Sequence, residues 1–195
     1  MKRFITLTTA FLLSLPLAAQ ASVWTIDPDH TTAQFKVRHL MISNVKGVFE
    51  KISGTLNLDD KDITKSKVDV SIDTASLNTN IKKRDEHLRS PEFFDVAKFP
   101  AMTFTSTKVE KSGPDKLKVT GNLTIKGVTK PVVLTVEGPS TEVKDPWGNG
   151  RRGASAVTTV NRKDFGVNWN KTMDNGGMVV GEEVAIQLEA EFVKK

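Results

Sequence analysis

The chain has 195 residues, of which 38% are hydrophobic and 26% are charged, and this balance fits one folded domain rather than a long disordered protein or a multidomain enzyme. Lysine and arginine (28) exceed aspartate and glutamate (23), so the formal net charge is +5, a bias too mild to predict nucleic-acid binding. The sequence has no cysteine, which excludes disulfides, a thiol nucleophile and a lipid-bearing cysteine.

The N-terminus has the pattern of an export signal. Lys2 and Arg3 precede an apolar run over 11–17, and a small-residue triplet follows at 19–21. Cleavage is expected after Ala21, so that residues 1–21 form a signal peptide and 22–195 a mature domain of 174 residues (195 less 21). No later apolar run is long enough to span a bilayer. We therefore expect a soluble protein of the bacterial periplasm, large enough to be stabilised by its core without disulfides.

Alternation of apolar and polar residues dominates the mature chain and predicts β-strands. In chain order, the alternating segments are 31–39, 67–73, 102–107, 117–125 and 184–192. In the first of them, His39 falls on the same predicted inward face as Phe35 and Val37. Between the first two segments, the apolar stretch 45–58 contains Gly47 and Gly54, which predict a bulge or sharp bend.

Turn residues separate these strands at 59–62, 112–115, 126–131 and 138–150. Such short connections leave no room for the helical crossovers that a parallel sheet requires. The sequence therefore predicts an all-β fold, with an antiparallel sheet of about eight strands that closes into a barrel.

One segment departs from the alternation and predicts a short helical insert near residues 80–95. A helix over 80–89 would be capped by Thr79 or Asn80, and Pro91 fits the first turn of a second short helix that carries Phe93 and Phe94. Because the insert interrupts the sheet between strands, we expect it to lie as a lid or plug over one end of the barrel.

The sequence contains no residues at the spacing of a known catalytic or metal site. His30, His39 and His87 lack metal-ligand spacing, and no serine elbow or phosphate-binding glycine loop occurs. His39 is read as a hydrogen-bonded core residue, with a functional role as the alternative, and His30 as part of a turn. The basic groups 82–84 and 151–152 are read as solvated faces rather than anion sites.

Taken together in this order, the motifs of the mature chain resemble the YceI-like family of exported, lipocalin-like bacterial proteins, in its periplasmic, signal-bearing branch. The resemblance covers essentially the whole mature chain. Its elements are the segments 24–31, 53–56, 76–79, 84–88, 93–96, 99–100, 121–132 and 161–166, with Ala33, Phe35, Val37, His39, Leu40, Gly47, Phe49 and Phe104.

The resemblance implies an antiparallel lipocalin-like β-barrel whose long apolar interior binds a polyisoprenoid or similar long-chain amphiphilic lipid, with no metal, no other cofactor and no transferable catalytic set. Carried over by position, the ligand-binding residues are expected to be Phe35, Val37, Phe49, Val70, Ile72, Phe93, Phe104, Leu123, Ile125 and Phe165, with Leu88 and Phe94 from the insert and His39 near the mouth. A pyrophosphate headgroup would be met by Arg38, Arg84, Arg152 or Lys82, and a quinone or amide by His39 or an asparagine.

Three interpretations of function follow. The leading one is a periplasmic lipid carrier that is not an enzyme; its partners would be the lipid and, transiently, a membrane, and not nucleic acid. The alternative is an enzyme acting on a lipid or small periplasmic substrate, with His39 as its acid or base. In the third, the barrel is filled and its surface binds a protein partner. Monomer and homodimer both stay open.

Overall fold

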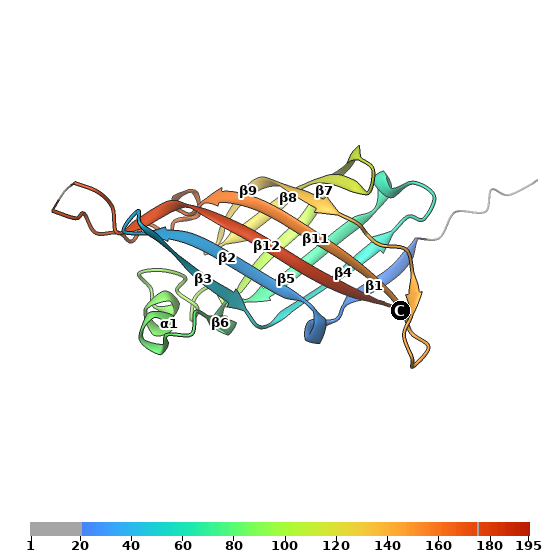
Figure 1. The fold of residues 1–195 in the computed structure, drawn as a ribbon, viewed down its shortest axis with the longest axis horizontal. Helices are drawn as coiled ribbons and strands as arrows, with labels where there is room; N and C mark the ends of the chain where they lie inside the picture. The colour runs from blue at the N-terminus through green and yellow to red at the C-terminus, as the bar shows by residue number, and fades with distance from the viewer. Residues whose placement is uncertain (1–20, 175) are drawn as a thin grey trace, which may run out of the picture.

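The computed structural model describes residues 21–174 and 176–195, so the predicted signal peptide, apart from Ala21, lies outside the described residues. The described chain is an elongated barrel with one α-helix at its left end (Figure 1). The strands are β1 (Ser22–Ile26), β2 (Thr32–His39), β3 (Ser43–Phe49), β4 (Ile52–Leu58), β5 (Lys67–Asp73), β6 (Leu77–Asn78), β7 (Ala101–Gly113), β8 (Lys116–Ile125), β9 (Val128–Glu137), β10 (Val143–Lys144), β11 (Gly150–Asn161) and β12 (Val180–Lys194). The helix is α1 (Lys82–Arg89), and single 3-10 turns are η1 (Pro28–His30), η2 (Ile63–Lys65), η3 (Thr74–Ser76) and η4 (Arg162–Phe165). No helix of the described segments combines the length and apolarity that a bilayer crossing requires.

Strand β12 closes the barrel because it pairs along both of its edges. One edge pairs with β11 from Arg151↔Val193 to Asn161↔Glu183. The other edge pairs with β2 over its first part and with β1 over its last residues. Since β2 pairs with β3 and β1 with β4, β1/β2 and β3/β4 are two long strands, each with one interruption. Together with β5, β7, β8, β9, β11 and β12 they form a closed eight-stranded antiparallel barrel, which confirms the predicted fold.

The two interruptions lie opposite each other. Between β1 and β2, Asp27 caps η1 by accepting a hydrogen bond from the Asp29 amide at 3.0 Å. Between β3 and β4 the chain leaves the ladder at Glu50 and Lys51, whose amides bond to the Ser76 carbonyl and hydroxyl at 3.2 and 3.1 Å. The bend predicted for 45–58 therefore lies between the two glycines and not at either of them. The hydrogen bonds that Glu50 and Lys51 donate to Ser76 of η3 hold the bend there.

The glycine Gly47 instead makes room for an aromatic ring. A Cβ at Gly47 would overlap the ring of Phe35, which crosses over it inside the barrel. Gly121 on β8 has the same relation to Phe104 on β7. Both rings therefore lie flat over a neighbouring strand, where a larger residue would displace them.

The insert differs in detail from its prediction. Asn80 has a left-handed φ of 63°, and Ile81 is the N-cap with no side-chain hydrogen bond, so capping by Thr79 or Asn80 was wrong. The reason is a bond in the opposite direction: the Asp85 carboxylate accepts from the Thr79 amide and hydroxyl, at 2.9 and 2.5 Å. This buried contact fixes the first turn of α1 to the end of β6.

The predicted second helix after Ser90 was also wrong, because residues 91–94 form turns. The chain folds back at Ser90, and the Phe94 amide donates to the Leu88 carbonyl at 3.0 Å while the Phe93 amide donates to Ser90. These bonds satisfy carbonyls at the end of α1 and leave no room for a new helix. They also direct Phe93 into the core, where it is 6% exposed.

The inward rows of the strands agree with the predicted alternation. Met102, Phe104 and Ser106 of β7 are buried, and Leu117 and Val119 of β8 are buried beside them. One seam of the wall is short: β9 pairs with β11 only over 135–137 and 155–157 among the described residues. Beyond those pairs, the Thr158 hydroxyl donates to the Val133 carbonyl at 2.9 Å.

Because the ring of Phe35 lies over Gly47, we predict that replacing this glycine destabilises the protein more than replacing Gly153. We expect Gly47→Ala to lower the free energy of unfolding by about 1–3 kcal/mol, because the added methyl displaces a packed ring. Gly153→Ala on β11 is the matched control, since its Cβ would meet nothing closer than 3.9 Å, and should change stability by less than about 0.5 kcal/mol. Urea unfolding measures both. Equal effects would contradict this account of Gly47.

Candidate ligand-binding site

A cavity of about 280 Å³ lies inside the barrel, so side chains do not fill it. Its wall is made of inward-pointing residues from most strands, from the insert and from η4. This volume is close to the lower end of sites that hold small organic ligands. Almost all of the lining is aliphatic or aromatic, so the cavity suits an apolar ligand.

Twelve of the thirteen predicted site residues line this cavity. They are Phe35, Val37, Phe49, Val70, Ile72, Leu88, Phe93, Phe94, Phe104, Leu123, Ile125 and Phe165. His39 is the exception: it is half-buried at the last position of β2, beyond Val37, and is not among the lining residues. The strand alternation placed His39 on the inward face, but the cavity ends before it.

Lining residues of β9 and β11 were not predicted. On β11 the inward positions include Ala154, Ala156 and Thr158, and these short side chains help to leave space in the barrel. The signal was present as a run of small residues over 153–156, but neither alanine stood out as part of an apolar row. On β9, the residues 132–134 are all apolar, so the alternation that would mark Val132 and Leu134 as inward-facing is not visible in the sequence.

Arg162 is a buried cation on the wall of the cavity, 6% exposed. Its guanidinium donates to the backbone carbonyls of Gly181, Val167 and Trp169 at 2.8, 2.6 and 2.8 Å. Within the described residues it makes no ion pair, and burial lowers its pKa from the ordinary value while the nearby charge of Glu182 opposes this. Arg162 therefore holds the loop 166–179 against the barrel through backbone oxygens.

An aromatic cluster joins that loop to the insert. Trp169 packs against Phe93 and His87, with ring centroids 5.0 and 5.2 Å apart, and His87 meets Phe93 edge-on at 4.9 Å. The His87 imidazole also bonds the Glu92 carboxylate at 2.6 Å. We call this end of the barrel, made by the turn 40–42, the insert 79–99 and the loop 166–179, the insert end. It lies at the left of Figure 1.

The opposite end is closed around Trp24, which is fully buried. Its indole N–H donates to the Ser22 hydroxyl at 2.9 Å, and the cations of Arg152 and Lys194 lie 5.0 and 5.3 Å from its ring. Among the described residues, none between 137 and 153 lines the cavity. The hairpin of β10 and β11 therefore contributes nothing to the lining, whereas Ser66 and Lys67, which lie at the same end of the barrel, do line the cavity.

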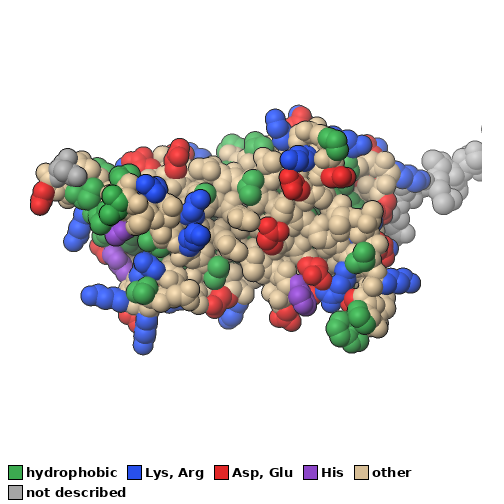
Figure 2. Space-filling view, in the orientation of Figure 1, with side chains coloured by type: hydrophobic (Ala, Val, Ile, Leu, Met, Phe, Trp, Pro, Cys, Tyr) green, Lys and Arg blue, Asp and Glu red, His purple; other side chains and the backbone are tan. Residues whose placement is uncertain are grey.

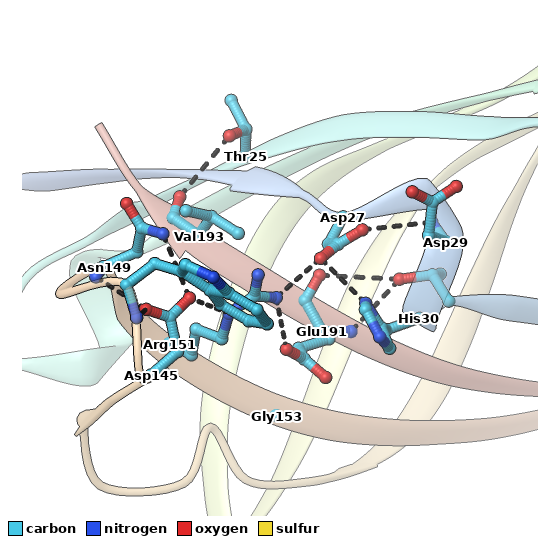
Figure 3. Close-up of polar contacts among 12 residues, drawn as sticks. Thr25, Asp27, Asp29, His30, Asp145, Asn149, Arg151, Gly153, Glu191 and Val193 are labelled. Atoms are coloured by element: carbon cyan, nitrogen blue, oxygen red, sulfur yellow. Dashed lines mark hydrogen bonds and ion pairs between the residues drawn. The ribbon is translucent and has the colours of Figure 1, made fainter.

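A network of charges around Arg151 also closes this opposite end (Figure 3). One guanidinium nitrogen, Nη1, lies 2.5 Å from both the Asp27 and Glu191 carboxylates, and Nε lies 2.7 Å from Asp145. His30 bonds Asp27 through Nδ1 at 2.9 Å. The network ties the break between β1 and β2 to β12 and to the hairpin before β11.

The expectation that the basic groups 82–84 and 151–152 are solvated is therefore correct only in part. The side chains of Arg151 and Arg152 are only 18% and 17% exposed, since each is held by partners on other segments of the chain. Arg84 bonds the hydroxyl and carbonyl of Thr79 at 2.7 and 2.9 Å. Lys82 and Lys83 are exposed, as predicted.

Ion pairing shifts the titration of this network. The hydrogen bond from Arg151, with a smaller one from His30, lowers the pKa of Asp27 from 3.8 to about 2. Arg151 also holds the pKa of Asp145 well below its usual range. The Asp27 carboxylate raises the pKa of His30. Asp27, His30 and Glu191 offer oxygen and nitrogen atoms within 4.8 Å of one another, but Arg151 Nη1 already lies against both carboxylates.

Comparison with known proteins identifies the family of this barrel. A family model described as YceI-like domain matches residues 24–192. The chain belongs to the YceI-like family. It is 42% identical over 190 residues to Protein YceI of Salmonella newport (strain SL254), covering 96% of both chains.

Solved structures give the same fold. A Campylobacter jejuni YCEI protein is similar at a TM-score of 0.68 and 36% identity, covering 81% of this chain and 90% of that one. A polyisoprenoid binding domain from Saccharophagus degradans is similar at a TM-score of 0.65 over 90% of this chain and 99% of that one. Its identity is 15%, so this last likeness shows the fold alone.

In this YceI-like chain, the motif at 161–166 has a structural explanation. Asn161 caps η4 by accepting from the Lys163 amide at 2.9 Å, and Arg162 holds the following loop. Phe165 is 2% exposed and faces the cavity. Gly166 has a left-handed φ of 74°, which ends the turn and starts the loop toward Trp169. The motif therefore builds the closure of the insert end.

The Asp27–Arg151 pair predicts a pH dependence of stability. Because the folded pKa of Asp27 lies below its unfolded value, the pair stabilises the fold above about pH 4 and this contribution is lost as the pH falls toward 2. Asp27→Asn should cost about 1–2 kcal/mol at pH 7 and correspondingly less near pH 2. Urea unfolding from pH 7 to 2 measures this. Asp69→Asn, an exposed carboxyl on β5, is the control; a cost of Asp27→Asn that did not shrink with pH would contradict the assignment.

The aromatic cluster predicts that Trp169 limits access to the cavity. Trp169→Ala removes two ring contacts worth about 1–3 kcal/mol together, so a fluorescent apolar probe should enter roughly tenfold faster. Stopped-flow uptake of N-phenyl-1-naphthylamine by lipid-free protein gives the rate. Trp147→Ala, in the exposed hairpin at the opposite end, is the control, and faster uptake in that variant instead would show that the probe enters at the other end.

Proposed function

We propose that this YceI-like protein is a periplasmic binding and carrier protein that holds a polyisoprenoid or similar long-chain amphiphilic lipid inside the barrel. The observation that carries the proposal is the cavity inside the barrel, whose wall is almost wholly apolar. The name of the Saccharophagus degradans domain, which has the same fold, supports the choice of a polyisoprenoid. The basic and apolar pattern of residues 1–21 supports export by a cleavable signal peptide.

The apolar lining of the cavity favours a hydrocarbon chain over a polar ligand. Each buried methylene is worth about 0.8 kcal/mol relative to water, so a dry lining binds an alkyl or prenyl chain strongly compared with the aqueous state. A bilayer is equally apolar, however, so transfer from membrane to cavity gains little from the hydrophobic effect. Selectivity then depends on how well the chain fits between rings such as Phe35 and Phe104, and on polar groups near the end of the cavity.

The headgroup is proposed to lie toward the insert end. Arg38 and Lys82 lie at this end and are exposed. Arg152, by contrast, lies over Trp24 at the other end, and Arg84 is committed to Thr79. A phosphate or pyrophosphate at the insert end would therefore meet Arg38 or Lys82 first.

Binding without catalysis is part of the proposal. An enzyme in this cavity would need an acid or base facing the ligand, and His39 was the candidate. The ionisable groups on the described lining are Lys67 and Arg162, with no histidine or carboxylate among them. Since the Arg162 guanidinium is bound to backbone carbonyls, these groups favour a carrier over an enzyme.

Placing a charge in the cavity tests the proposal. We expect the protein purified without detergent to show a stoichiometric lipid adduct by native mass spectrometry. Leu123→Asp and Phe35→Asp each aim a carboxylate at the chain, which costs several kcal/mol and should reduce the adduct to below about a tenth. Val133→Asp, on the outer face of β9, is the control and should keep the lipid.

Circular dichroism establishes that each variant is folded. A folded Leu123→Asp protein that still carries the lipid would overturn the cavity as the site. Wild-type protein that is empty, and takes up no added polyprenyl lipid, would overturn the proposed function itself.

A further inference from the structure

Four exposed hydrophobic side chains are gathered at the insert end. Ile42 is 78% exposed, Ile81 53%, Met41 43% and Met178 40%. They come from three segments that are distant in sequence, and the Leu40 amide joins the first to the third by donating to the Val179 carbonyl at 2.8 Å. Figure 2 shows hydrophobic side chains clustered at this left end of the molecule. Nothing in the described fold covers them.

Cationic side chains accompany these hydrophobic ones. Over the insert end, with Arg38 added, there are seven lysines and arginines and five acidic residues. Of the five acidic side chains, Asp85 is buried against Thr79 and Glu92 bonds the His87 imidazole. Lys83 and Lys171 are exposed and make no ion pair with any described residue.

The cavity extends to the elements that carry this surface. Val37 and Val180, which line it, are five and two residues from Ile42 and Met178 along the chain, and Leu88 lines it from α1, the helix that Ile81 caps. Trp169 and Phe93 close the end between the insert and the loop. An exposed tryptophan also occurs at the opposite end, where Trp147 is 81% exposed, but its hairpin contributes no lining residue and the Arg151 network lies between.

We propose that the insert end is a docking surface for an anionic phospholipid bilayer. Ile42, Ile81 and Met178 enter the headgroup region, the lysines meet the lipid phosphates, and the lipid passes between membrane and cavity beneath Trp169. This rests on the proposed function, because a lipid of such low solubility has to leave and reach a bilayer. Exposed apolar side chains together with the unpaired Lys83 and Lys171 suit an anionic bilayer, whereas a protein partner would have no need of the cavity.

Vesicle cosedimentation tests the proposal. Wild-type protein should bind vesicles of phosphatidylcholine with phosphatidylglycerol about tenfold better than vesicles of phosphatidylcholine alone, and raised salt should weaken this binding. Ile42→Asp should lose about tenfold in affinity for the anionic vesicles, and the double variant Lys83→Glu with Lys171→Glu should lose the preference for them. Trp147→Asp, a matched change at the opposite end, should bind as wild type.

Native mass spectrometry of the same samples separates the two proposals. Variants that keep the lipid but bind vesicles less support the docking surface. Wild-type protein that keeps its lipid but binds no anionic vesicle overturns the docking surface and leaves the carrier intact. Ile42→Asp that binds like wild type, or Trp147→Asp that loses binding, also overturns it, as does capture of a protein partner at Ile42 without vesicle binding.

Discussion

The double pairing of β12 is the constraint on which the rest of the structure depends. By bonding to β11 along one edge and to β2 and β1 along the other, it leaves no open edge in the ring of eight strands. Once the sheet is closed, every second residue of each strand faces a shared interior. The apolar rows of the sequence become the wall of a cavity, and the short side chains of β11 and the rings folded over Gly47 and Gly121 determine its shape.

Different kinds of interaction close the two ends of this barrel. At the Trp24 end, the partly buried ion pairs of Arg151 join three parts of the chain, and separating them would leave charges without partners. At the insert end, closure relies on ring contacts of Trp169 and on Arg162, whose partners are backbone carbonyls. Separating the ring contacts alone leaves no charge without a partner, whereas moving the loop away from Arg162 would remove carbonyl partners from a buried cation.

Local pattern was sufficient to predict the strands, their inward faces and the place of the insert, because period-two alternation and turn residues act over a few positions. Prediction from local pattern failed where contacts between residues distant in sequence determine the structure. The partners of Arg151 are Asp27, Asp145 and Glu191, which no spacing rule connects, so the pair 151–152 was read as solvated. The cap of α1 was misplaced because Asp85 reaches back to Thr79. His39 continued an inward row, but a strand can extend past the cavity it lines.

The seam between β9 and β11 has the shortest described ladder in the barrel wall. Along 128–134 the strand β9 is held mainly by β8; from the other side, among the described residues, the Thr158 hydroxyl bonds to it and η4 packs near it. Pro131, which lacks an amide proton, is tolerated in this stretch because the ladder on one edge is already missing. Every other junction in the ring would have to break a longer ladder before its strands moved apart. Separating the wall at this junction would therefore break fewer ladder pairs than separating it at any other, and the other strands would keep their register.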